Sequence, residues 1–158
     1  MTINTLEDLF IHDLSDVYSA EKQITRALPK MARAATDPTL VAAFNQHLEE
    51  TQGQIERLDQ LVDSTEGVRI KRMKCHALEG LAEEAQEIID AVEAGPVRDA
   101  GLIGAAQKVE HYEIATYGTL LALAKKLGYR EAAKLLEATL KEEKATDEKL
   151  SVISDQQP

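Results

Sequence analysis

Residues 107–121 read QKVEHYEIATYGTLL, a helical pattern with unusual chemistry on one face. Steps of three and four residues define one face of a helix. On that face two carboxylates, Glu110 and Glu113, stand where apolar residues are expected, with Ile103 before them and Tyr117 after them. Burying a carboxylate without a partner is costly. The pattern therefore predicts a cation beside this helix.

The composition indicates one helical domain. A chain of 158 residues can fill a single domain, residues 1–158, but is short for two. Apolar residues make up 44% of it, and strong helix formers such as Ala, Leu, Glu and Lys are abundant. Alternating strand patterns and Asn-Gly or Asp-Gly hairpin turns are absent from the sequence. An all-α fold is predicted.

Charge and cysteine content restrict the partners and the compartment. The formal net charge of −10 argues against nucleic acid and anionic membranes as partners. The sequence has no apolar run of the ~20 residues that a membrane-spanning helix needs. The lone Cys75 fits a reducing compartment, and the N-terminus does not resemble a signal peptide. We expect a cytoplasmic protein.

Start and stop signals predict four long helices and one short one. The first helix begins near Thr5, and the second begins at the Asp37-Pro38 pair and closes at 64–67. The connection 68–96 contains a shorter amphipathic helix over 77–93. The last two long helices cover 97–127 and 129–153, Gly128 caps the former, and residues 154–158 should fray. One long crossover between two helix hairpins is the ferritin-like arrangement of a four-helix bundle.

All four long helices carry acids in the middle of their apolar faces. The candidates are Glu21, Glu50, Glu110 with Glu113, and Glu143 with Asp147. Carboxylates that share a dry core repel one another, so two divalent metal ions are predicted to neutralise them. Oxygen ligands favour iron, manganese, magnesium or calcium over metals that prefer sulfur.

Nitrogen ligands are scarce in this pattern. The usual template places a histidine three residues after one glutamate on each of two helices. Gly53 and Thr146 stand at these positions after Glu50 and Glu143, whereas His47 precedes Glu50 by three residues. His47 is either a metal ligand or a core histidine bonded to an acid, and both interpretations are open.

The alternative is that some of these acids lie on the surface, exposed to solvent, as charged residues usually do. Glu113 and Asp147 are most open to it, because small helix rotations would turn them away from the core. Glu49 and Glu142 are expected to be exposed. The hydroxyl groups of Tyr18, Tyr112 and Tyr117 either bind ligand carboxylates or simply reach solvent.

Several blocks of the chain resemble the YciF-type family of bacterial ferritin-like proteins. The blocks are TLEDLFIHDLSDVYSAEKQITRALPKMA, HLEETQGQIERLDQL, VEHYEIATYGTLLALAKKLG and LEATLKEEKATDEKL, which together cover nearly the whole chain. The resemblance implies a rubrerythrin-like four-helix bundle, a homodimer, a di-metal site and a part in bacterial stress responses. No catalytic activity is established for that family, so it names a fold rather than a reaction.

Two functions follow as hypotheses. In the first, two irons held by carboxylates react with peroxide or dioxygen, and a separate molecule supplies electrons because the chain lacks a cysteine-rich electron-transfer domain. In the second, the protein is not an enzyme, and the metal holds the bundle together in a stress protein. The sequence leaves the choice between an enzyme and a structural protein open.

Overall fold

The computed structural model describes residues 2–157. Within that range the chain forms five helices and no strand, which confirms the predicted all-α fold. The helices are α1 (Leu6–Ala34), α2 (Pro38–Ser64), α3 (His76–Ala91), α4 (Pro96–Leu127) and α5 (Arg130–Gln156).

The capping residues predicted from the sequence are found at the ends of the helices. Thr5 and Asp8 form a reciprocal capping box at the start of α1, and the Asp37 side chain caps α2. Gly128 ends α4 with a left-handed backbone at φ 74°, a conformation that favours glycine. The predicted end of the last helix is residue 153, and α5 continues to Gln156; fraying of the terminal residues stays a prediction. The last turns of α5 are held by Ile153, which is 4% exposed. Pro158 lies outside the described residues.

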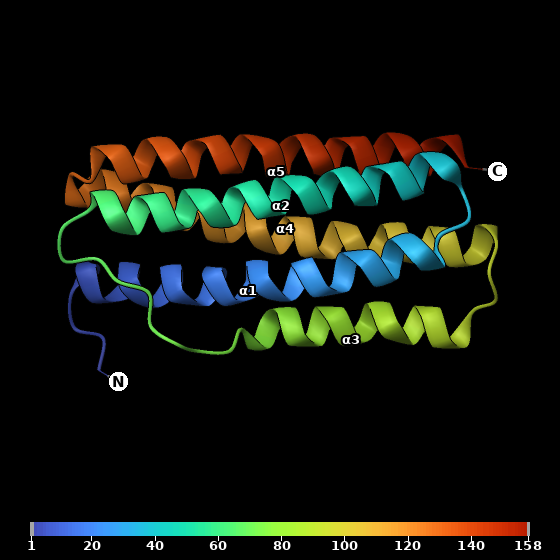
Figure 1. Ribbon diagram of the computed structural model, residues 1–158, viewed down its shortest axis with the longest axis horizontal. Helices are drawn as coiled ribbons and strands as arrows, with labels where there is room; N and C mark the ends of the chain where they lie inside the picture. Colours follow the sequence, from blue (N-terminus) through green and yellow to red (C-terminus); the bar gives the residue numbers. More distant parts are fainter. Residues whose placement is uncertain (1, 158) are drawn as a thin grey trace.

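The four long helices form a bundle of two antiparallel hairpins, α1 with α2 and α4 with α5 (Figure 1). After α2 the chain returns along the bundle, so that α4 runs in the same direction as α2. This return contains α3, which packs on α1 and α4. Gly101 permits a close approach, since a Cβ there would lie 2.8 Å from Ile88 Cγ2. The predicted bundle with a helical crossover is confirmed.

A polar layer divides the core into two apolar clusters. One cluster includes Ile24, Phe44 and Leu102, and the other includes Phe10 and Leu58. The acids predicted in mid-helix lie between them along the helices. No helix among the described residues is both long and apolar enough to cross a membrane.

Asp99, in the first turn of α4, holds the loop between α1 and α2. It is 3% exposed, and its two oxygens accept the backbone N–H groups of Thr36 at 2.8 Å and Asp37 at 2.9 Å. The positive end of the α4 dipole also favours its negative charge. Asp99 therefore ties the two hairpins together at one end of the bundle.

Replacing Asp99 with alanine should lower the free energy of unfolding by about 2–4 kcal/mol, because two backbone N–H groups lose a charged acceptor. Urea denaturation followed by circular dichroism measures the change. Asp63→Ala, on the exposed side of α2, is the matched control and should shift stability by less than about 0.5 kcal/mol. Equal effects of the two substitutions would contradict the role assigned to Asp99.

Candidate metal centre

Four buried side chains converge in the polar layer. His47, Glu110, Glu113 and Glu143 each offer one potential ligand atom, and these atoms all lie within 4.8 Å of one another. The three glutamates are fully buried, and His47 is 4% exposed. Three helices supply the cluster: α2 carries His47, α4 carries both Glu110 and Glu113, and α5 carries Glu143. Glu110 and Glu113 share a face because they are separated by about one helical turn.

These four residues keep their polar atoms free of hydrogen bonds. Both carboxylate oxygens of Glu110, Glu113 and Glu143 are buried without a hydrogen-bond partner, as are both ring nitrogens of His47. His47 Nε2 lies 2.6 Å from Glu110 Oε1, but the two groups are not oriented as a hydrogen bond. Buried polar atoms nearly always have partners. Eight buried polar atoms without hydrogen bonds, on four side chains that converge, fit a cage for metal ions.

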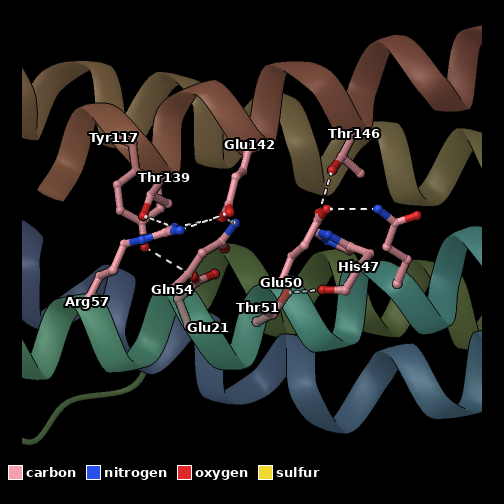
Figure 2. Close-up of polar contacts among 11 residues, drawn as sticks. Glu21, His47, Glu50, Thr51, Gln54, Arg57, Tyr117, Thr139, Glu142 and Thr146 are labelled. Carbon is pink, nitrogen blue, oxygen red and sulfur yellow. Dashed lines mark hydrogen bonds and ion pairs between the residues drawn. The ribbon is translucent and has the colours of Figure 1, made fainter.

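Glu21 of α1 extends the cluster. It is fully buried, and its Oε2 accepts a hydrogen bond of 3.0 Å from the Tyr117 hydroxyl, while its Oε1 has no partner. This is the contact between a tyrosine and a candidate ligand that the sequence suggested, and Figure 2 shows the two side chains together. The other two tyrosines bind acids outside the cluster: Tyr18 donates to Asp59, and Tyr112 donates to Asp16.

Glu50 and Asp147 flank the cluster but are not among its four members. Glu50 is half-buried and accepts a hydrogen bond of 3.2 Å from Gln46. It accepts another, of 3.1 Å, from Thr146 (Figure 2). The Asp147 side chain is 21% exposed, with Oδ2 3.2 Å from His111 Nε2 and Oδ1 buried without a partner. Metal binding by the seven predicted residues stays a prediction. The structure brings four of them together, and the other three lie around that cluster: His47, Glu110, Glu113 and Glu143 form it, with Glu21, Glu50 and Asp147 beside it.

A second polar group lies beside the cluster, and the sequence analysis missed its main member. Arg57 of α2 donates to both oxygens of Glu142, at 2.7 and 2.9 Å, and also to Thr139 (Figure 2). The expectation that Glu142 is exposed is therefore wrong, because this ion pair makes it half-buried. Gln54, fully buried, donates to Glu142 and leaves its Oε1 unpartnered. The position of Gln54 on the apolar face of α2 was the sequence feature that could have indicated this polar group.

Burial sets the acidity of the cluster in the absence of metal. Desolvation, together with the negative charges of Glu21 and other nearby acids, raises the pKa of Glu110 from 4.5 to about 8. Burial likewise raises the pKa of Glu21 to about 7. The pKa values of Glu113 and Glu143 are also raised well above their usual range, mainly by desolvation. Metal-free protein thus holds several protonated carboxyls in its core.

Comparison with known proteins places the chain in a family. The family described as a domain of unknown function, DUF892, matches residues 5–157. The chain belongs to this family. Protein YciF of Escherichia coli K12 is 66% identical over 151 residues, which are 96% of this chain and 91% of that protein. The resemblance to the YciF-type family is therefore confirmed.

Solved structures agree with this DUF892 assignment. The crystal structure of the E. coli stress protein YciF matches with a TM-score of 0.95 at 64% identity and covers 96% of each chain. Symerythrin from Cyanophora paradoxa matches with a TM-score of 0.71 at 19% identity, covering 98% of this chain and 86% of that one, which supports the fold alone. The fold of this DUF892 chain is ferritin-like.

The donor set limits the chemistry open to this DUF892 protein. Carboxylate oxygens outnumber imidazole nitrogens, a mixture that suits hard or borderline divalent cations rather than metals bound through sulfur. Carboxylates can also bridge two ions and move between binding modes. The buried His/Glu cluster can therefore hold metal, and its flanking acids offer more ligands than one ion requires.

Proposed function

We propose that this DUF892 chain is a carboxylate-rich dinuclear metal protein whose two ions are iron. The single observation that carries the proposal is the set of eight buried, unpartnered ligand atoms on His47, Glu110, Glu113 and Glu143. One divalent ion would leave much of the surrounding negative charge uncompensated. Glu21, Glu50 and Asp147 supply the ligands for a second ion.

The proposed reaction is the reduction of peroxide or dioxygen during stress. Two iron ions held by His47, Glu110, Glu113 and Glu143 with the flanking acids would supply the two electrons that, with two protons, reduce one hydrogen peroxide to two waters. The chain contributes the surroundings: the Tyr117 hydroxyl fixes Glu21, and the apolar clusters on both sides keep bulk water from the layer. A separate electron donor then restores iron(II). The 66% identity to YciF, whose structure is described as that of a stress protein, supports the biological setting.

Metal content tests this proposal directly. Protein purified without chelator should contain about two iron ions per chain by plasma mass spectrometry, as in other dinuclear bundles. The double variant Glu110→Gln/Glu143→Gln should lose both ions, whereas Glu49→Gln, on the exposed side of α2, should retain them. Negligible metal after anaerobic loading with iron(II) would overturn the proposal.

The alternative function is structural, with the metal stapling the bundle. It is favoured by the position of the layer, which interrupts the core and joins α2, α4 and α5 through a single cluster. Glu110→Gln separates the two functions. If the variant folds but no longer turns over peroxide, the enzymatic function is supported. If the variant unfolds and the parent protein shows no peroxide turnover, the structural function is supported. A homodimer in the cytoplasm is part of both proposals, and sedimentation equilibrium tests the dimer.

A further inference from the structure

An apolar pocket lies beneath α3 and extends to the candidate metal centre. Its volume is about 20 Å³, and residues of α1, α2, α3 and α4 line it. His47 and Glu110 are its polar lining residues, and the others are aliphatic side chains or methionine. The pocket therefore adjoins two members of the cluster from the side on which α3 covers the bundle.

A surface groove borders this pocket. The groove, of about 300 Å³, lies between α1 and α3, and four residues line both hollows: Ala27, Met31, Ala82 and Ala85. Three of these four are alanines, whose short side chains leave little bulk between the groove and the pocket. The groove and the pocket are thus separated only by these small or flexible side chains.

The size and the lining of the pocket select its occupant. A volume of this order admits one small molecule, such as a water or a diatomic gas. A buried water needs two to four polar partners, and the only ones nearby become occupied once His47 and Glu110 bind metal. An ion or a peroxide would lose its hydration without compensation. A neutral, apolar diatomic gas needs no hydrogen-bond partners and loses little hydration, so neither cost opposes its binding.

A different hollow suits polar molecules. Between α2 and α5 a pocket of about 80 Å³ also reaches His47, and its lining includes Gln46, Glu50, Thr146 and Lys149. These side chains are joined by hydrogen bonds, including one of 2.6 Å from Lys149 to Gln46. The centre therefore has an apolar approach on one side and a polar approach on the other.

We propose that the pocket beneath α3 is a dioxygen-binding site that delivers this gas to the metal centre from the α1–α3 groove. The proposal deepens the proposed function, because dioxygen becomes the substrate that uses the apolar side, and to that extent it rests on the metal site. Binding of the gas needs no metal, so it can be measured independently.

Xenon, an apolar probe of dioxygen sites, tests the binding step in metal-free crystals. Crystals pressurised with xenon should show one xenon atom between α1, α3 and α4, beside Ala106. Ala82→Leu should remove it by filling the mouth of the pocket, whereas Ala77→Leu, an exposed position on α3, should keep it. The absence of xenon from the pocket of the parent protein would overturn the proposal whatever the metal content.

Stopped-flow oxidation of iron(II)-loaded protein tests delivery. Ala82→Leu should slow the reaction with dioxygen about tenfold, equivalent to about 1.4 kcal/mol in the barrier, and leave the reaction with hydrogen peroxide unchanged. Ala145→Leu, which narrows the polar pocket, should leave the dioxygen rate unchanged. The reverse pattern would overturn the route. Failure of iron to bind would instead contradict the proposed function and leave the xenon result standing.

Discussion

Metal-free protein should become less stable as the pH rises from about 5 to 8, with a loss on the order of 3 kcal/mol. Glu21 and Glu110 have folded-state pKa values of about 7 and about 8, against 4.5 for an ordinary glutamate. A raised pKa means that the folded state binds protons more tightly than the unfolded state. Its stabilising contribution is complete below pH 4.5 and is lost as the pH passes through 7 and 8.

Urea denaturation of chelator-treated protein at a series of pH values measures this slope. Metal-loaded protein is the internal comparison, and its stability should rise over the same range, because protons compete with metal for the carboxylates. A flat profile in metal-free protein would show that these acids are not buried as the structure places them. Parallel slopes with and without metal would show that the acids do not bind it.

Glu113→Gln should stabilise the metal-free protein at pH 8 by about 1–3 kcal/mol while lowering metal affinity at least about 100-fold. Both Glu113 oxygens are buried without partners, and its pKa is raised mainly by desolvation and then by the charges of Glu143 and Glu21. Glutamine keeps the shape of the side chain, cannot ionise and can donate to Glu21. The substitution therefore removes the cost of burying an acid that ionises freely in the unfolded chain, but it also removes a candidate ligand.

Two titrations test the predicted gain in stability and the predicted loss of metal affinity. Urea unfolding without metal gives the change in stability, and competition with a chromogenic chelator gives the metal affinity. Glu49→Gln, which removes an exposed carboxylate from α2, should alter neither quantity appreciably. Unchanged metal affinity in Glu113→Gln would exclude Glu113 from the ligand set, and loss of stability would show that its charge has a partner in solution.

The sequence predicted the helices well because their signals are local. The Asp37-Pro38 pair and Gly128 act through their own backbone geometry, which a few neighbouring residues determine. Asp99 went unnoticed for the opposite reason. Its partners, Thr36 and Asp37, lie more than 60 residues away in the chain, and no local pattern reveals that pairing. The last helix extends past its predicted end at residue 153, where the burial of Ile153 depends on tertiary packing that the local sequence does not reveal.

Helical periodicity predicted which face of each helix the candidate site residues occupy, but not how their side chains meet. Spacing correctly placed Glu110 and Glu113 on a buried face, but it did not separate the central cluster from Glu50 and Asp147 at its edge. That distinction depends on side-chain rotamers and on neighbours from other helices. The Arg57–Glu142 pair shows the same limit, because a long flexible side chain reaches a partner that periodicity does not identify.

The position of α3 makes two properties of the protein separable. The central cluster comes from α2, α4 and α5, with Glu21 added by α1, whereas α3 covers the apolar pocket and contributes no member. If the proposed metal and dioxygen sites are present, substitutions on α3 would change how fast a gas arrives without changing how tightly metal is held. Selection could then act on the kinetics of arrival through one helix and on metal affinity through the other four.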